Sequence, residues 1–296
     1  MRIVDPQPGD DLEPVDDPGP AAAPAHGAEP ADRSGEGDGA DRAGEGDGAD
    51  RAGEGADKRG ATGRAAPFVA VLDYGIGNLR SAERALRKVG AAARLVTCAE
   101  GAAGAAGVVL PGVGAFGKCA EALRGSGLDR VALDAIESGT PFFGICVGMQ
   151  LLYAGSEEDP GAVGLGVFPR RVVGLPPGVK RPQMQWNQVV PTEAGRNSAL
   201  VGSVGTAAWF YFVHSFAPEI GAETVATCDY GGPVVAACER ENVWATQFHP
   251  EKSGEDGLAL LAAFVGRCGK GASAGSAEMS TGGTGRRSAQ AVGGGA

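Results

Sequence analysis

The chain has 296 residues and a formal net charge of −10, but residues 1–66 hold 16 of the 36 acidic and 7 of the 26 basic residues, so the rest is nearly neutral. A nearly neutral domain without a basic stripe argues against nucleic acid as a partner, and the chain shows neither a signal peptide nor an apolar run of about 18 residues that could span a membrane. The six cysteines have no CxxC spacing, which predicts a reduced, cytoplasmic enzyme.

Both ends of the chain have low-complexity composition. Residues 1–66 contain almost no large apolar side chains and a nine-residue repeat that begins at Asp32 and again at Asp41, so they are predicted to be disordered. We consider two origins for this tail, a misassigned translation start or a dispensable extension. Residues 269–296 are rich in Gly, Ser and Ala and are predicted to form a second flexible tail. Residues 67–268 are long enough for one domain with a sizeable core.

The first half of this domain alternates predicted strands and helices, which favours a largely parallel sheet. We predict strands at 68–73, 92–97, 108–110 and 141–145, and helices at 79–89 and 116–137. Asn78 is the predicted N-cap of the first helix. The third strand runs into Pro-Gly-Val-Gly at 111–114, a turn at the sheet edge where open α/β folds bind ligands. Gly75 and Gly77 form only part of a dinucleotide fingerprint, so nucleotide binding is not favoured.

Short β-rich runs dominate the second half of the domain. They lie at 186–191, 209–216, 224–230, 234–238 and 243–249. An amphipathic helix at 257–268 is predicted to close the domain. The sequence therefore predicts an α/β fold in which a mixed sheet extends the parallel core.

Cys146 lies on the turn between the predicted strand at 141–145 and a predicted helix at 149–153, an arrangement typical of a nucleophile elbow. Gly144 and Gly148 are small because side chains two positions before and after the nucleophile would clash across such a turn. The helix N-terminus favours the thiolate, and the Val147 N–H is positioned to serve as one oxyanion donor. The competing interpretation is an inert cysteine buried in the core.

The catalytic base has to be His214 or His249, because the chain has three histidines and His26 lies in the predicted N-terminal tail. His249 ends an apolar strand, and Glu251 follows it after one proline, close enough in sequence to orient the imidazole. We therefore predict Cys146, His249 and Glu251 as nucleophile, base and orienting acid. The competing interpretation of His249 is a structural histidine at a strand end. His214 is predicted either to be structural or to line the site.

Several separated motifs resemble the class I (triad) glutamine amidotransferases, namely Gly-Ile-Cys-Val-Gly-Met-Gln at 144–150, Pro-Gly-Val-Gly at 111–114 and His-Pro-Glu at 249–251. More narrowly, four segments of this chain, at 73–81, 110–116, 211–215 and 248–254, resemble the glutaminase subunits of imidazole glycerol phosphate synthase. The resemblance spans residues 68–268 and leaves out the tails. It implies a flavodoxin-like open mixed sheet flanked by helices, the class I glutamine amidotransferase fold.

The resemblance also implies an activity and a partner. It implies hydrolysis of L-glutamine through a glutamyl thioester on Cys146, with no cofactor and no metal. The ammonia would pass to a cyclase subunit, a (β/α)8 barrel in a heterodimer with this chain. That subunit would make imidazole glycerol phosphate and aminoimidazole carboxamide ribonucleotide, a step of histidine biosynthesis.

Residue roles carry over from the same resemblance. Gly112, Val113 and Gly114 would form the other half of the oxyanion hole beside Val147. Gln150, His214 and Ser215 would contact the substrate. The residues expected at the partner interface are Asn78, Lys180 and Trp186.

The sequence departs from the family pattern in two places. Gln183 and Gln185 stand in Pro-Gln-Met-Gln-Trp-Asn at 182–187, where relatives commonly carry His and Gly, so the coupling to the cyclase is in question. Phe216 stands where tyrosine is common. Neither departure touches the triad.

Three alternatives to this function stay open on the sequence. The first is a class I amidotransferase of another pathway, although such proteins usually carry His where Met149 stands and lack the Asp-Tyr-Gly-x-Gly-Asn opening at 73–78. The second is a catalytically silent regulatory or scaffold subunit, against which the intact triad argues. The third is a stand-alone cysteine hydrolase or chaperone of similar topology, which would not need the His-Pro-Glu arrangement.

Overall fold

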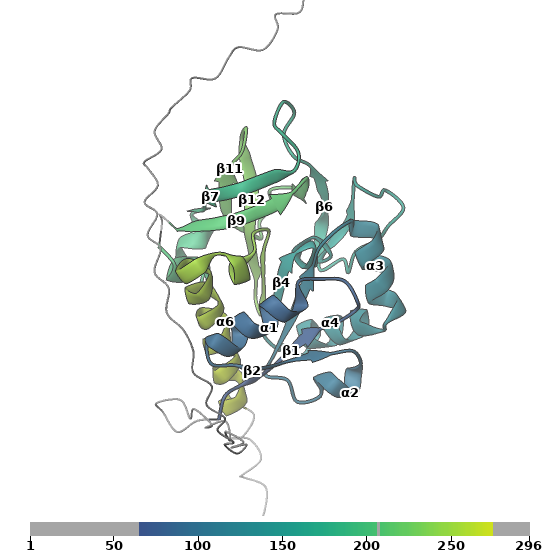
Figure 1. The fold of residues 1–296 in the computed structure, drawn as a ribbon, viewed down its shortest axis with the longest axis vertical. Helices are drawn as coiled ribbons and strands as arrows, with labels where there is room; N and C mark the ends of the chain where they lie inside the picture. The colour runs from purple at the N-terminus through teal and green to yellow at the C-terminus, as the bar shows by residue number, and fades with distance from the viewer. Residues whose placement is uncertain (1–64, 206–207, 275–296) are drawn as a thin grey trace, which may run out of the picture. The chain divides into compact units, whose positions relative to one another are not determined.

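The computed structural model describes residues 65–205 and 208–274, with side chains as far as residue 269; the rest of both predicted tails lies outside the described residues. The described residues build a central eight-stranded sheet (Figure 1) in the order β2, β1, β3, β4, β13, β12, β11, β8. In that order the strands span Ala92–Val96, Phe68–Leu72, Gly107–Gly112, Phe142–Cys146, Val243–Thr246, Pro233–Arg240, Thr224–Asp229 and Val190–Pro191.

The sheet is parallel from β2 to β13 and antiparallel from β13 to β8, which confirms the predicted mixed sheet. Strands β3 and β4 are buried along their whole length, as expected for apolar strands covered on both faces. Because these two strands run in parallel, their carboxyl ends meet at one edge of the sheet. The register places Gly112, the last residue of β3, beside Cys146, the last residue of β4.

Two groups of helices flank the sheet (Figure 1). Helix α1 packs against α6, whereas α2 and α3 pack against α4. The α6 group is anchored by Phe264, whose ring lies 5.3 Å from the ring of Phe143 on β4 and 6.3 Å from that of Trp244 on β13. The helices span Leu79–Lys88, Ala99–Ala102, Phe116–Gly125, Leu128–Glu137 and Gly254–Ala274 for α1, α2, α3, α4 and α6.

Two smaller sheets lie beside the antiparallel half. One has three strands, β5, β6 and β10, at Tyr153–Ser156, Phe168–Gly174 and Phe216–Pro218. The other is an antiparallel ribbon of β7 at Gln183–Gln188 and β9 at Trp209–His214. On β9 the side chains alternate between the two faces of the ribbon: Phe210 and Phe212 are fully buried, whereas Trp209 is 51% exposed. The Phe210 ring stacks 4.0 Å from that of Phe248, which fixes the ribbon against the core.

The helix predicted at 116–137 is wrong in one respect, because the structure divides it into α3 and α4. The break falls at Gly127, which has a φ of 73°. Glycine adopts this left-handed conformation at little cost, and a residue in this conformation ends an α-helix. Ser126 closes α3 by donating its hydroxyl to the carbonyl oxygen of Leu123 at 2.9 Å.

The boundaries of two other predicted helices also differ. The elbow helix α5 spans Val147–Gln150, and Tyr153 belongs to β5 rather than to this helix. Packing explains the difference, since the Tyr153 ring lies 5.1 Å from that of Phe168 and its hydroxyl 2.8 Å from the Cys238 sulfur. Helix α6 begins at Gly254 and reaches Ala274, six residues beyond the predicted end of the domain. None of the helices that the structure describes is long and apolar enough to cross a bilayer.

Candidate active site

The elbow places Cys146 at the end of β4, directly before α5. Its φ of 55° and ψ of −112° are strained for a residue with a Cβ, as the elbow interpretation predicts. The residue is 3% exposed, and its accessible part lies on a cavity rather than on the outer surface. A strained backbone that the surrounding sheet holds in place is typical of a functional residue.

The two elbow glycines are small for different reasons. A Cβ on Gly144 would lie 2.9 Å from the Gly148 carbonyl oxygen, which is the predicted clash across the turn. A Cβ on Gly148 would instead collide with the Leu110 carbonyl oxygen on the neighbouring strand β3. The second glycine is therefore required by the approach of α5 to β3, not by the turn itself.

The glycine-rich turn after β3 forms the wall of the cavity beside Cys146. Val113, Gly114 and Val147 all line the cavity, and Gly114 has a φ of 89°. Gly112 is crowded, since a Cβ there would lie 2.8 Å from both the Gly148 nitrogen and the Tyr74 hydroxyl. The structure thus brings the four residues predicted for the oxyanion hole to one edge of the sheet.

His249 and Glu251 form a buried pair next to Cys146. The His249 Nδ1 lies 2.9 Å from the Glu251 Oε1, and both side chains are at most 2% exposed. Glu251 belongs to the short helix η3 at Pro250–Lys252, which turns its carboxylate back toward the imidazole. Burial opposes charge on the imidazole, but the adjacent Cys146 and Glu251 outweigh burial and raise the pKa of His249 to about 9. Both neighbours therefore favour the protonated form of His249.

A second donor reaches the same carboxylate oxygen. The Asn78 Nδ2 donates to the Glu251 Oε1 at 3.2 Å. Asn78 occupies the predicted N-cap position of α1, but its side chain makes no capping hydrogen bond. The side chain predicted for the partner interface thus touches the predicted triad.

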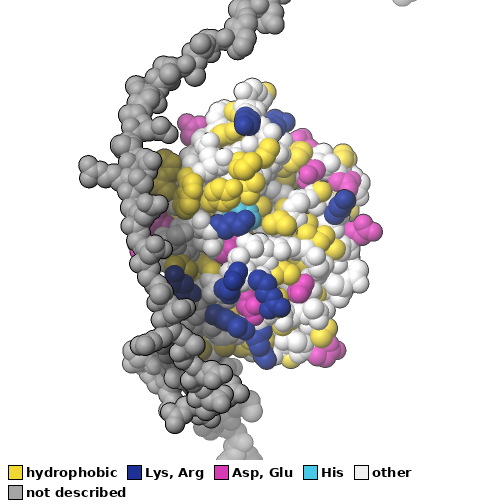
Figure 2. All heavy atoms as spheres, in the orientation of Figure 1, with side chains coloured by type: hydrophobic (Ala, Val, Ile, Leu, Met, Phe, Trp, Pro, Cys, Tyr) yellow, Lys and Arg dark blue, Asp and Glu magenta, His cyan; other side chains and the backbone are white. Residues whose placement is uncertain are grey.

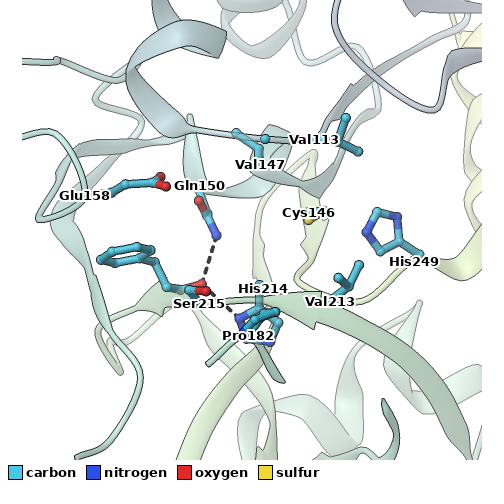
Figure 3. A pocket seen from close by; sticks show the side chains of 12 residues that line it. Val113, Cys146, Val147, Gln150, Glu158, Pro182, Val213, His214, Ser215 and His249 are labelled. Atoms are coloured by element: carbon cyan, nitrogen blue, oxygen red, sulfur yellow. Dashed lines mark hydrogen bonds between the residues drawn. The ribbon is translucent and has the colours of Figure 1, made fainter. Parts of the chain in front are cut away.

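The cavity has a volume of about 240 Å³ and lies at the carboxyl ends of β3 and β4. Figure 3 shows Cys146 and His249 on one side of it and Gln150, Ser215 and His214 on the other. Its lining residues are Val113, Gly114, Cys146, Val147, Gln150, Glu158, Pro182, Val213, His214, Ser215, Phe216 and His249.

The far side of the cavity is organised by the backbone carbonyl of Phe216. It accepts hydrogen bonds from the His214 Nδ1 at 2.9 Å and from the Gln150 Nε2 at 3.0 Å (Figure 3). Because a carbonyl oxygen only accepts, the proton of His214 sits on Nδ1. Burial lowers the pKa of His214 to about 4, so this imidazole is neutral at pH 7. Its Nε2 is buried and has no hydrogen-bond partner among the described residues.

Sequence analysis did not identify two polar residues at this site. Glu158 lines the cavity and accepts the Phe116 N–H at 2.8 Å, which places a carboxylate at the N-terminus of α3. Gln247 is fully buried, and its Nε2 lies 3.7 Å from the Cys146 sulfur. The sequence does contain one signal for Gln247, because it is a polar residue within the apolar run that leads to His249.

The remaining predicted partner residues lie near the β7–β9 ribbon. Trp186 on β7 is 48% exposed, and its ring meets that of Tyr211 edge-on at 6.2 Å. The Lys180 carbonyl oxygen accepts the Tyr230 hydroxyl at 2.8 Å. Gln183 and Gln185, which depart from the family pattern, differ in burial: Gln183 is fully buried opposite His214 in the ribbon, whereas Gln185 is exposed.

Among residues 65–205 and 208–269 the acidic, cysteine and histidine side chains form no group of three placed to hold a metal ion. Cys98 is the exposed free cysteine, and the other five are buried.

Comparison with known proteins agrees with this geometry. The family model "Glutamine amidotransferase class-I" matches residues 70–267. The imidazole glycerol phosphate synthase subunit HisH of Methanothermobacter thermautotrophicus is 46% identical over 198 residues, which is 67% of this chain and 97% of the relative. The subunit HisH of Deinococcus radiodurans is 46% identical over 205 residues, 68% of this chain and 94% of the relative.

Solved structures share the fold. A crystal structure of a glutamine amidotransferase has a TM-score of 0.54 at 21% identity and matches 68% of this chain and 98% of its own. A chain of PurLQS from Thermotoga maritima gives the same TM-score, identity and coverage. The chain belongs to the class I glutamine amidotransferase family and, within it, groups with the HisH subunits of imidazole glycerol phosphate synthase.

Proposed function

We propose that this chain hydrolyses L-glutamine, with Cys146 as nucleophile, His249 as general base and acid, and Glu251 as the residue that orients His249. The observation that carries the proposal is the 2.9 Å His249–Glu251 pair on the same cavity as the strained elbow cysteine. A nucleophile, a base and an orienting carboxylate in this order are the parts that covalent acyl transfer needs.

The proposed reaction has two halves, the formation of a glutamyl thioester and its hydrolysis. The Cys146 thiolate bonds to the carboxamide carbon of glutamine, and the carbonyl oxygen takes up the displaced electron pair. Protonated His249 then donates its proton to the leaving nitrogen, so that ammonia departs and a glutamyl thioester remains. Water, deprotonated by His249, attacks the thioester, and glutamate and the thiolate are released.

The oxyanion is held by backbone N–H groups in this proposal. Val147 supplies one from the first residue of α5, and the Gly112-Val113-Gly114 turn supplies the other. Val113 and Gly114 of this turn line the same cavity as Val147 and Cys146. One lost donor of this kind costs about 100- to 1000-fold in rate, so the shape of this turn controls activity.

The far side of the cavity would bind the amino-acid end of glutamine. Both hydrogens of the Gln150 Nε2 are engaged, by the Phe216 carbonyl and by the Gln247 Oε1 at 3.1 Å. Gln150 therefore offers its Oε1, and neutral His214 its Nε2, both of which only accept. Two acceptors suit the α-ammonium group of glutamine, and the Ser215 hydroxyl lies beside them.

The ammonia acceptor would be a cyclase subunit, a (β/α)8 barrel, bound as a heterodimer on the outer face of the β7–β9 ribbon. We define this face as Met184, Trp186, Trp209, Tyr211 and Val213, which the strand register places on one side. Met184 is 62% and Trp186 48% exposed, and Figure 2 shows hydrophobic side chains gathered over these strands. Val213 also lines the cavity, so a partner here would sit where ammonia leaves.

The test is glutamate release by the full chain, alone and with the same organism's cyclase subunit and its nucleotide ligand. We expect strong activation by the partner and complete loss in Cys146→Ser. The control is Cys98→Ser, which changes the exposed cysteine and should leave the activity intact. Glutaminase activity that does not depend on this partner would support the proposed reaction but assign the chain to another pathway. Activity that survives Cys146→Ser would refute the mechanism.

A further inference from the structure

Gln247 is a polar side chain in a fully buried position. It lies between Thr246, the last residue of β13, and Phe248, and it is 0% exposed. A buried amide is costly unless its nitrogen and oxygen both find partners. Here the Oε1 accepts from Gln150 at 3.1 Å, and the Nε2 lies 3.7 Å from the Cys146 sulfur.

The direction of these hydrogen bonds is set by one backbone group. The Phe216 carbonyl only accepts, so Gln150 has to turn its NH₂ group toward it. The same nitrogen donates its second hydrogen toward Gln247, which has to answer with its oxygen. The NH₂ group of Gln247 is then left facing the sulfur of Cys146. This assignment needs no observed hydrogen positions, because reversing either amide would set two donors or two acceptors against each other.

An N–H group that faces sulfur favours one state of the nucleophile. A neutral thiol is a weak acceptor, whereas a thiolate is a strong one, so the hydrogen bond strengthens when the proton leaves. The amide is buried, and water does not compete with it. The Gln247 N–H therefore acts directly on the Cys146 sulfur, the nucleophilic atom of the proposed reaction.

We infer that Gln247 is a catalytic residue whose amide N–H stabilises the Cys146 thiolate, and that Gln150 holds this amide in its donating orientation. The inference deepens the proposed function and rests on it for the identity of the reaction. It also gives Gln150 a second task, since the side chain that we assign to the substrate ammonium is one amide away from the nucleophile.

The test uses the full chain and measures alkylation of Cys146 by iodoacetamide at neutral pH, resolved by peptide mass spectrometry. Gln247→Met keeps the length of the side chain and removes the donor, and we expect about tenfold slower alkylation, the loss of one hydrogen bond to a charged group. Gln247→Glu keeps the acceptor for Gln150 but sets an oxygen against the sulfur, and we expect a larger loss. Cys98, exposed in the same sample, is the internal control and should react at an unchanged rate.

Glutamine turnover supplies the second readout. We expect kcat to fall about tenfold in Gln247→Met while KM stays within about twofold, because the lost contact is to the nucleophile and not to the substrate. A side chain that merely fills space predicts wild-type alkylation and an unchanged kcat in this variant, and either result would overturn the inference.

Two features keep the outcomes separate. Alkylation needs no glutamine, so a wild-type chain that releases no glutamate would refute the proposed function, while the alkylation ratio would still decide the role of Gln247. If Gln247→Met does not fold, Gln247→Asn decides instead, because its shorter amide cannot reach both Gln150 and the sulfur. Slower alkylation of Cys146 in that folded variant would support the inference, and alkylation at the wild-type rate would overturn it.

Discussion

The two sides of the cavity each carry one buried histidine, and the surroundings shift the pKa values of the two imidazoles in opposite directions. His249 is 1% exposed and lies 2.9 Å from a carboxylate oxygen of Glu251, whereas His214 is 6% exposed and lies 2.9 Å from the carbonyl oxygen of Phe216. The pKa of the first is raised to about 9, and that of the second is lowered to about 4.

Burial opposes the imidazolium at both positions, so the partner atoms decide the outcome. An anionic carboxylate and the adjacent Cys146 more than repay the cost of burying a charge, and a neutral carbonyl does not. Two strand-end histidines that look alike in the sequence are therefore suited to different tasks. One can move protons, and the other can only accept a hydrogen bond through Nε2.

The largest loss of activity should come from giving His249 a neutral partner, as His214 already has. Glu251→Gln replaces the carboxylate with a neutral amide, which no longer favours the imidazolium and can present a donor to Nδ1. We expect kcat/KM for glutamine to fall about a hundred- to ten-thousand-fold, as in other triads that lose the orienting acid. The measurement is glutamate release by the partner-bound chain.

The matched control for this change is Glu255→Gln, a carboxylate exposed on the first turn of α6. This surface substitution should alter kcat/KM by less than about twofold. A Glu251→Gln variant that kept near wild-type turnover would show that a neutral partner orients His249 equally well.

The pH dependence of stability should separate the histidines next. His249 has a folded pKa above its ordinary value of 6.5, so its contribution is complete below pH 6.5 and is lost as the pH rises through about 9. His214 has a folded pKa below 6.5, so its contribution is present above pH 6.5 and is lost as the pH falls toward about 4. Each effect is on the order of 3 kcal/mol in the free energy of unfolding.

Urea unfolding of His249→Asn and His214→Asn against wild type measures these two windows. The difference between wild type and His249→Asn should shrink between pH 6.5 and about 9. The difference between wild type and His214→Asn should shrink between pH 6.5 and about 4. Differences that stay constant across both windows would mean that neither imidazole has a shifted pKa.

The smallest effect should come from Asn78→Ala, which removes the second donor to the Glu251 Oε1 and leaves the His249 contact in place. We expect a loss of about three- to tenfold in kcat, since one hydrogen bond that orients the carboxylate is gone. Asn197→Ala, at an exposed position on η1 (Ala194–Asn197), is the control and should be silent. If Asn78→Ala were equally silent, the His249 contact alone would fix the carboxylate.

The sequence predicts the parts of this site that depend on local order along the chain. Gly144 and Gly148 around Cys146 predict the elbow, and Glu251 two residues after His249 predicts the pair. Alternating apolar strands and helices likewise predict the parallel part of the sheet. Each of these features is written within a few neighbouring residues, so one sequence is enough to recognise it.

Features that depend on contacts between distant segments could not be predicted. Gln247 contacts Gln150 and Cys146, about a hundred residues away, and nothing in the local pattern points to them. Gly148 is required by Leu110 on another strand, and Tyr153 leaves the elbow helix because it packs on Phe168. Tertiary packing overrides local propensity at such positions.

The most direct test of the comparison is ¹⁵N NMR of the full chain labelled at histidine, near pH 7. The chain has only three histidines, and His26→Gln identifies the signal from outside the described residues. We predict one imidazolium, assigned to His249 by its loss in His249→Asn, and one neutral ring protonated on Nδ1, assigned to His214. A neutral His249 at pH 7 would contradict the account, because Cys146 and the carboxylate of Glu251 would then not outweigh burial.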